Sequence, residues 1–106
     1  RYISVTGVQT CALPISLQPS QASALLEALP GWAIEAGELV KAFTFPDYHR
    51  TLAFVNAVAW IAHAEDHHPE LQVGYGRCRV AYSTHSIGGL SENDFICAAR
   101  IEALQS

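Results

Sequence analysis

The chain has 106 residues, with six basic and ten acidic side chains and a formal net charge of −4 at pH 7. Arg77 and Arg79 are its nearest equivalent to a basic run, so it lacks the electrostatic footprint of a protein that binds nucleic acid directly. Its most apolar stretch, residues 52–64, is too short to span a bilayer and contains Asn56 and His63.

The first sixteen residues resemble a translated sequencing adapter, most clearly over residues 5–16. A real strand beginning near Tyr2 is the alternative interpretation. A non-native segment of this kind carries no information about the fold. The remaining residues, 17–106, suit a single domain with one core, small enough to gain stability from association.

Cysteine usage favours a reducing compartment. With Cys11 set aside as part of the first segment, Cys78 and Cys97 remain, which is too few for a disulfide framework. Free cysteines are typical of cytosolic proteins, so a cytoplasmic location is expected.

In chain order, the first predicted element is a helix over residues 21–29, with Ser20 as its N-cap and Pro30-Gly31 as its stop signal. Residues 32–35 and 38–45, separated by an Ala-Gly turn, predict a β-hairpin. The side chains of its second strand alternate between two faces, as in a half-buried strand.

The rest of the chain predicts a second helix followed by a second hairpin. A long helix is expected over residues 47–65, a third strand over 71–75, a fourth over 77–84 and a last helix over 91–104. The order α-β-β-α-β-β-α predicts an α+β fold, in which three helices pack on one face of a four-stranded antiparallel sheet.

The long helix is apolar around most of its circumference. A core stripe at helical spacing is predicted at Leu52, Val55, Ala59 and Ala62. Further apolar side chains occupy the other sides, at Phe54, Val58, Trp60 and Ile61. Because so small a domain cannot cover this helix all round, a second subunit is the expected cover; a ragged margin of the core is the alternative.

The side chains best suited to catalysis gather near the end of the long helix and the end of the fourth strand. His67 and His68 stand between Asp66 and Pro69, and His85 ends the fourth strand. Because Pro69 stops the helix and favours an extended backbone before it, the two adjacent imidazoles point in different directions. Histidine titrates near neutral pH, so the sequence predicts proton transfer on a small ligand where helix end and strand end meet.

Other roles for these side chains stay open. His63 and His67, four residues apart, could interact with the helix dipole as C-terminal caps. Asp94 stands three residues after Ser91 in a capping-box pattern, which alone would explain it. Asp66 could be an ordinary surface charge.

A metal site is the main chemical rival. His63, His67 and His85, together with a carboxylate, could supply the ligands that zinc requires. Residues 63–67 do not match His-Glu-x-x-His, because the glutamate stands one place late. No cysteine has a partner at the spacing of a structural zinc site.

Three motifs taken together resemble the pterin-4a-carbinolamine dehydratase family. They are Asp-His-His-Pro-Glu at residues 66–70, Ser-Thr-His at 83–85 and Gly-Leu-Ser-Glu-Asn-Asp at 89–94, and the likeness extends from about residue 17 to residue 104. The resemblance implies the α-β-β-α-β-β-α fold and assembly into homodimers or homotetramers, the latter through the helix over residues 47–65. It also implies a reaction that uses no metal or cofactor.

The activity implied is dehydration of 4a-hydroxytetrahydropterin to quinonoid dihydropterin and water, which recycles pterin for an aromatic amino acid hydroxylase. By resemblance, His67 and His85 are the acid–base pair and His68 mainly holds the pterin, so all three are catalytic candidates. Asp94 would orient or polarise one imidazole. The residues implied to contact the substrate are Asp66, His67, His68, Ser83, Thr84, His85, Ser86 and Asp94.

Three positions depart from the pattern of the animal members. His63 stands where an acidic residue is common, Leu71 replaces a frequent Trp, and Ile87 replaces a Cys. None of these removes a proposed acid or base. Two non-enzymatic alternatives remain: pterin binding without turnover, and action as a dimerisation cofactor for a transcription factor.

Overall fold

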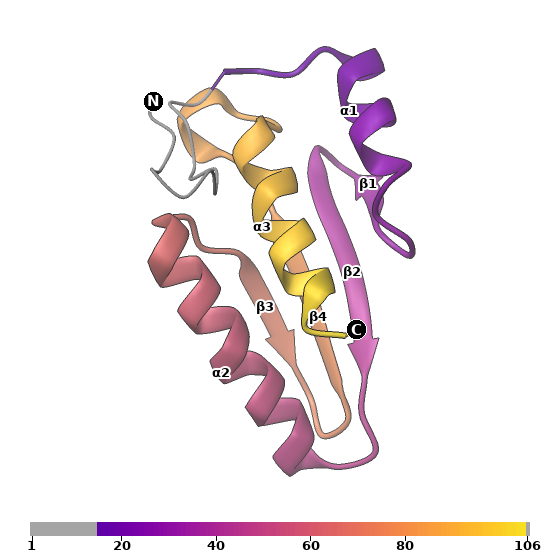
Figure 1. Cartoon of the computed structure of the whole chain (residues 1–106), viewed down its shortest axis with the longest axis vertical. Coiled ribbons are helices and arrows are strands. Elements are labelled where there is room, and N and C mark those ends of the chain that lie inside the picture. Colours follow the sequence, from indigo (N-terminus) through magenta and orange to yellow (C-terminus); the bar gives the residue numbers. More distant parts are fainter. Residues whose placement is uncertain (1–14, 106) are drawn as a thin grey trace.

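The computed structural model describes residues 15–105 (Figure 1). The helices and strands follow in the order α-β-β-α-β-β-α, as the sequence predicts. Their bounds are α1 Pro19–Leu26, β1 Ala33–Glu35, β2 Glu38–Thr44, α2 Tyr48–Glu65, β3 Glu70–Val73, β4 Arg77–Tyr82 and α3 Glu92–Ala103, with a 3-10 turn, η1, at His85–Ile87. No helix within the described range is long and apolar enough to cross a membrane.

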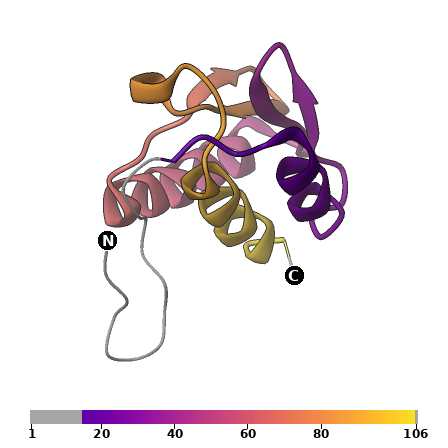
Figure 2. The same ribbon diagram turned by 90° about the horizontal axis from the view of Figure 1, so that it is seen from above.

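The four strands form one antiparallel sheet in the order β1-β2-β4-β3. β1 pairs with β2, and β3 pairs with β4, so the sheet consists of two hairpins. The hairpins join where β2 pairs with β4, from Leu39 opposite Tyr82 to Thr44 opposite Arg77. All three helices lie on the same side of this sheet (Figure 2). The predicted fold class is therefore confirmed.

The core fills the space between the sheet and the helices. Alternate residues of β4, namely Cys78, Val80 and Tyr82, have no exposed surface. They belong to one buried cluster with side chains from β2, α2 and α3, among them Leu39, Phe43, Phe54, Val58, Phe95 and Ile101. Burial of each large apolar side chain contributes about 1.5–3 kcal/mol, so this cluster holds β2, β4, α2 and α3 together.

Helix α1 differs from the prediction at both ends. It begins at Pro19 with Gln18 as its N-cap, not Ser20, because the fixed φ and missing N–H of proline suit the first helical turn. The Gln18 N–H donates to Gln21 Oε1 at 2.9 Å as part of a capping box. The helix ends at Leu26, and i to i+3 hydrogen bonds continue the turn beyond it.

The buried face of α2 is rotated away from the predicted stripe. The residues that α2 buries are Thr51, Phe54, Val58, Ala62 and Glu65. Of the predicted stripe, only Ala62 is buried. Because apolar side chains surround this helix, their periodicity does not determine which side faces the core.

Polar residues at both ends of the buried face find partners inside the protein. The Thr51 hydroxyl lies 2.8 Å from the Asp47 carbonyl oxygen and 2.9 Å from that of Tyr75. Glu65 Oε2 lies 2.6 Å from Arg100 Nε of α3. Hydrogen-bonded or paired polar groups can be buried at little cost, which allows the helix to turn this face inward.

Both strands of the second hairpin end earlier than predicted. β3 stops at Val73, which leaves Tyr75 in the turn, and β4 stops at Tyr82. Beyond β4, the Thr84 N–H donates to the Gly89 carbonyl oxygen at 2.8 Å and closes a small loop. This loop contains His85 and Ser86, two of the predicted site residues.

Most of the predicted adapter-derived segment lies outside the described residues. Of residues 1–16, only Ile15 and Ser16 are described, and Ser16 forms an isolated β-bridge with Ser91. Leu17 continues this contact through its N–H, which donates to the Leu90 carbonyl oxygen at 3.0 Å. The non-native origin of the segment stays a prediction.

Candidate functional site

The end of α2 separates the two adjacent histidines. Its C-cap, Asp66, has the left-handed φ of 52°. The Asp66 N–H contacts the Ala62 and His63 carbonyl oxygens, and the His67 N–H donates to Ala62 O at 3.0 Å. This reversal of the backbone turns His67 inward, with 15% of its side chain exposed, and leaves His68 exposed. The expectation that the two imidazoles point in different directions is met.

His67 is held on two sides. Its Nε2 lies 2.6 Å from Asp94 Oδ1. Its ring stacks on Tyr82 of β4, with centroids 5.2 Å apart and planes 23° apart. The Tyr82 hydroxyl also donates to the His67 carbonyl oxygen at 3.1 Å. Both the ring and the backbone of His67 are therefore fixed against β4 and α3.

The carboxylate of Asp94 is fully buried and accepts from three directions. Oδ2 accepts from the Ser91 N–H at 2.9 Å and from the Thr84 hydroxyl at 2.8 Å, while Oδ1 faces His67. Ser91 and Asp94 form the predicted capping box of α3. Several hydrogen-bond donors are what a buried carboxylate requires. The Asp94 side chain thus caps α3 and contacts His67 at the same time.

The partners of Asp94 assign the tautomer of His67. A carboxylate oxygen can only accept, so the hydrogen on His67 resides on Nε2 and is donated to Asp94 Oδ1. The neutral ring then keeps a lone pair on Nδ1. An imidazole oriented by a carboxylate in this way can accept a proton and return it, as a general base and acid must.

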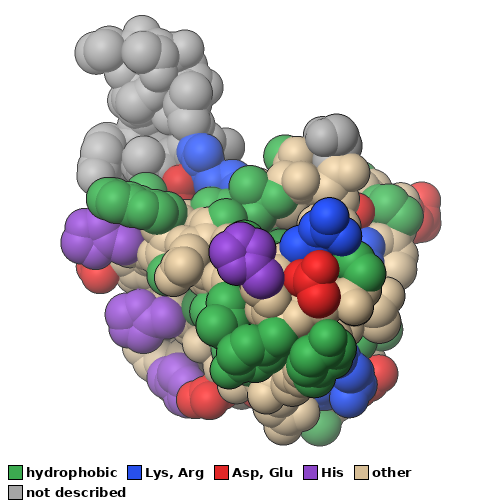
Figure 3. Space-filling model, turned by 90° about the horizontal axis from the view of Figure 1, so that it is seen from below, with side chains coloured by type: hydrophobic (Ala, Val, Ile, Leu, Met, Phe, Trp, Pro, Cys, Tyr) green, Lys and Arg blue, Asp and Glu red, His purple; other side chains and the backbone are tan. Residues whose placement is uncertain are grey.

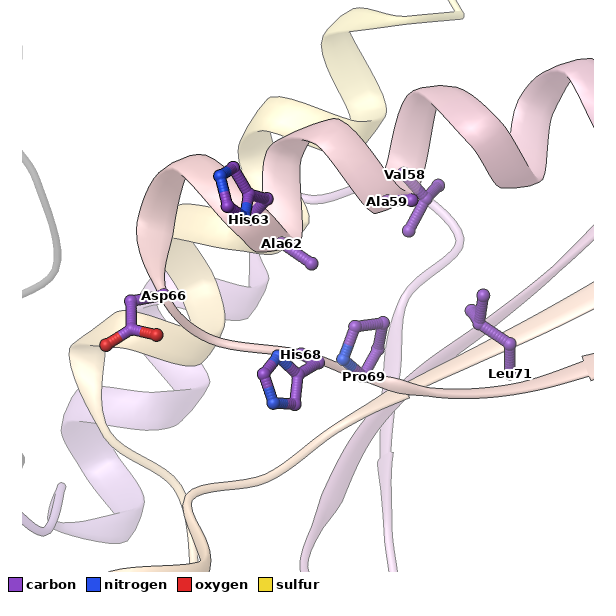
Figure 4. Close-up of a pocket in the computed structure, with 8 residues that line it drawn as sticks. All are labelled: Val58, Ala59, Ala62, His63, Asp66, His68, Pro69 and Leu71. Carbon is purple, nitrogen blue, oxygen red and sulfur yellow. The ribbon is translucent and has the colours of Figure 1, made fainter.

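A cavity of about 330 Å³ lies where α2 ends and the chain leads into β3, and Figure 4 shows the residues that line it. Its wall is apolar, formed by Val58, Ala59, Ala62, Pro69 and Leu71. His63, Asp66 and His68 also line the cavity and supply its ionisable groups. An apolar wall with a few polar groups is typical of a site for a small molecule.

The segment at the end of β4 lines a second hollow of about 290 Å³. It contains the Ser-Thr-His motif, with Ser83, Thr84 and His85, and faces the turn of the first hairpin. His85 starts the 3-10 turn η1 and is exposed, as is Ser86, which does not line this hollow. Several histidine side chains lie along one margin of the surface seen in Figure 3.

A buried network connects the two hollows. Asp66 and His68 line the first, and His67 between them contacts Asp94. Asp94 accepts from Thr84, which lines the second hollow next to His85. Most of the predicted site residues thus line one of two hollows, where a single cleft was expected. His67 and Asp94 line neither hollow and join the two groups, and Ser86 also lies outside both.

Two contributions to this site were not predicted. Tyr82 was assigned only to the core face of its strand, and its stacking on His67 depends on side-chain geometry that spacing does not reveal. The hydrogen bond of Ser91 to Thr84, 2.8 Å between hydroxyl oxygens, was also missed. Within residues 15–105, no group of three His, Cys, Asp or Glu side chains is placed to hold a metal ion, so the zinc arrangement of His63, His67 and His85 is not formed.

Comparison with other sequences identifies close relatives. A family model described as pterin 4 alpha carbinolamine dehydratase matches residues 15–104. A protein of Nitrosomonas eutropha is 54% identical over 89 residues, covering 83% of this chain and 79% of the relative. A protein of Xanthomonas oryzae pv. oryzae is 66% identical over 82 residues, covering 76% and 70%. Both carry the provisional name pterin-4-alpha-carbinolamine dehydratase.

Solved structures share the fold. A transcriptional coactivator/pterin dehydratase from Brucella melitensis superposes with a TM-score of 0.81 at 32% identity, covering 85% of this chain and 98% of that one. A pterin dehydratase-like protein identified as a RuBisCO assembly factor in the alpha-carboxysome gives a TM-score of 0.57 at 26% identity, covering 69% and 84%.

Proposed function

Because the chain belongs to the pterin-4-alpha-carbinolamine dehydratase family, we propose that it dehydrates 4a-hydroxytetrahydropterin to quinonoid dihydropterin and water. The reaction would recycle the pterin used by an aromatic amino acid hydroxylase. It is a hydro-lyase reaction and, as proposed, uses no metal or cofactor.

Loss of hydroxide from C4a needs two proton transfers. Hydroxide is a poor leaving group, so an acid must protonate the 4a-oxygen as the C–O bond breaks, and a base must take the proton from N5. We assign these roles to His67 and His85. His68 would mainly hold the pterin, and Asp94 would orient His67.

The contact between His67 and Asp94 carries this proposal. A buried carboxylate 2.6 Å from Nε2 orients the ring and stabilises its protonated form during turnover, as carboxylates do for catalytic histidines generally. The ring of His67 is also held by the face of Tyr82, and a ring fixed in one orientation is what a general acid–base group requires.

We place the pterin against residues 66–68. The apolar wall of the 330 Å³ cavity suits the flat ring, while the backbone and the side chains of Asp66 and His68 suit its amide-like edge. The segment that carries Ser83, His85 and Ser86 would approach the ring from its other side. His67, in the buried network between the two segments, would then serve the reacting centre.

The proposed assembly is a homodimer or homotetramer in the cytoplasm, formed through α2. The face of α2 away from the core leaves Trp60 73% exposed beside a shallow hollow lined by Asn56, Ala59 and His63. A second copy of α2 would cover this surface. Proposed partners are the pterin and, in recycling, a hydroxylase. We propose no direct contact with nucleic acid and no association with a membrane.

The test follows the decay of enzymatically generated 4a-hydroxytetrahydropterin by ultraviolet absorbance, with a metal chelator present throughout. Wild type is compared with His67→Ala, His85→Ala and the matched control His49→Ala, which alters an exposed histidine at the start of α2. We expect the first two variants to lose roughly a hundredfold or more of the acceleration, as for an acid–base group, and His49→Ala to keep it.

Binding without turnover is the alternative that this experiment separates. If folded wild-type protein binds pterin but does not accelerate the decay, the dehydratase proposal is wrong and a pterin-binding module remains. The same result would direct attention to a coactivator-like role, of the kind named for the Brucella melitensis structure.

A further inference from the structure

The hydroxyl of Thr84 faces inward. The residue is only 5% exposed, and Oγ1 lies 2.8 Å from Asp94 Oδ2 and 2.8 Å from Ser91 Oγ. The resemblance implies that Thr84 contacts the substrate, but here its hydroxyl is occupied by two protein partners. A buried hydroxyl with both its donor and an acceptor site in use is poorly placed to bind a ligand as well.

These hydrogen bonds have a definite direction. A hydroxyl donates once, and Thr84 donates to the acceptor-only carboxylate of Asp94. In the contact between the two hydroxyls, Ser91 must therefore be the donor. The Ser91 N–H donates to the same carboxylate oxygen. Asp94 Oδ2 thus accepts hydrogen bonds from Thr84 and Ser91, which leaves Oδ1 to accept from His67.

Thr84 is also the residue from which the His85 loop departs. Its N–H bonds to Gly89 O at 2.8 Å, and its own carbonyl oxygen accepts from the Ile87 N–H at 3.2 Å. The side chain of Thr84 therefore connects the start of the loop that carries His85 to the carboxylate that orients His67.

We propose that Thr84 is a positioning residue, which locks the Asp94 carboxylate onto His67 and anchors the loop of His85 through the same hydroxyl. The catalytic half of this inference rests on the proposed function. The geometric half does not, because the ring nitrogen of His67 that carries the hydrogen can be identified without any substrate.

The test compares Thr84→Val, which removes the hydroxyl but keeps the shape, with Thr84→Ser, which keeps the hydroxyl. Thr51→Val is the matched control, since Thr51 is likewise a buried threonine with a bonded hydroxyl but lies in the first turn of α2. The ¹⁵N chemical shifts of the His67 ring report which nitrogen carries the hydrogen. Steady-state kinetics separate kcat from KM.

We expect wild type, Thr84→Ser and Thr51→Val to show the Nε2–H tautomer, and Thr84→Val to show a mixture. The kcat of Thr84→Val should fall by about 10-fold to 100-fold, as when an orienting partner of a histidine is lost, with KM almost unchanged. Thr84→Ser should restore it. Should Thr84→Val not fold, Thr84→Cys, with a weak thiol donor, should give an intermediate tautomer mixture.

Two results would overturn the proposal. A rise in KM with unchanged kcat and an unchanged tautomer would make Thr84 a substrate contact. If Thr51→Val lost as much kcat as Thr84→Val, the hydroxyl of Thr84 would contribute to stability alone. A wild-type protein that shows the single tautomer but no turnover would contradict the proposed function and leave the geometric inference standing.

Discussion

Asp94 serves a helix cap and a histidine with the same carboxylate. Oδ2 accepts the N-cap N–H of Ser91, and Oδ1 accepts from His67. The helix that Asp94 caps also holds the carboxylate still, so the rigidity of α3 is transmitted to the His67 ring. At the residue scale, the capping interpretation and the catalytic interpretation of Asp94 are therefore compatible and support one another.

The backbone of Asp66 is the second residue-scale feature of the site. A left-handed φ of 52° costs an ordinary residue about 1–2 kcal/mol, whereas glycine adopts it freely and asparagine tolerates it. We predict that Asp66→Gly is as stable as wild type or more stable, and that Asp66→Val loses about 1–2 kcal/mol in the free energy of unfolding in urea.

Asp66→Asn is the control for this prediction, because it removes the charge and keeps a residue suited to the left-handed region. It should unfold close to wild type. A β-branched Asp66→Val variant with wild-type stability would show that the backbone conformation at this position carries no strain.

Residue type and spacing alone are enough to single out His67, His68, His85 and the capping box around Asp94. They do not reveal the stacking of Tyr82 on His67 or the inward hydroxyl of Thr84. Both depend on which way a side chain turns across two elements distant in sequence. Spacing along one chain does not encode that choice.

At the scale of elements, the strands were the easier prediction. Alternation in β4 places Cys78, Val80 and Tyr82 on one face, and all three are fully buried. The predicted buried face of α2 was wrong, because it was placed from apolar residues alone. Thr51 and Glu65 are polar, yet both are buried with partners from other segments. Tertiary pairing of polar groups decided the orientation of the helix.

A polar cluster of Trp32, Lys41 and Glu102 connects β2 and α3 to the turn after α1. Glu102 Oε1 accepts from Lys41 Nζ at 2.8 Å and from Trp32 Nε1 at 2.9 Å, and Lys41 Nζ also donates to Pro30 O at 2.8 Å. Desolvation alone would raise the pKa of Glu102, but the hydrogen bonds from Lys41 and Trp32 outweigh it and hold the pKa below its ordinary value of 4.5.

The lowered pKa of Glu102 makes its contribution to stability depend on pH. A carboxyl group with a depressed folded-state pKa stabilises the protein fully above 4.5 and loses that contribution as pH falls through the folded-state value. We predict that Glu102→Gln loses about 1 kcal/mol near neutral pH, and that the difference from wild type shrinks at acidic pH.

Urea unfolding of both proteins between about pH 6 and about pH 3 measures this difference. Glu35→Gln is the matched control, because Glu35 lies 3.4 Å from Arg79 at an exposed site. Its effect should be small at every pH. A difference between wild type and Glu102→Gln that stays constant from neutral to acidic pH would contradict the assigned role of the cluster.

At the scale of the whole molecule, one chain leaves an apolar side of α2 uncovered. The core covers Phe54 and Val58, but Leu52 remains 37% exposed and Trp60 73% exposed. At about 25 cal/mol per Å², covering most of a Trp side chain of roughly 200 Å² contributes about 3 kcal/mol. For a domain this small, that gain is a substantial fraction of the total stability, which is about 5–15 kcal/mol for native proteins.

We therefore predict that the wild-type protein is oligomeric and that Trp60→Glu weakens its association by a hundredfold or more in Kd, since a central Trp often dominates an interface. Light scattering after size exclusion measures the mass over a dilution series. Tyr75→Glu is the control, because Tyr75 is 70% exposed but lies in the turn between β3 and β4. It should leave the mass unchanged. A monomeric wild type, or equal dissociation by both variants, would mean that α2 is not the interface, and the exposed apolar residues would then be a margin of the core.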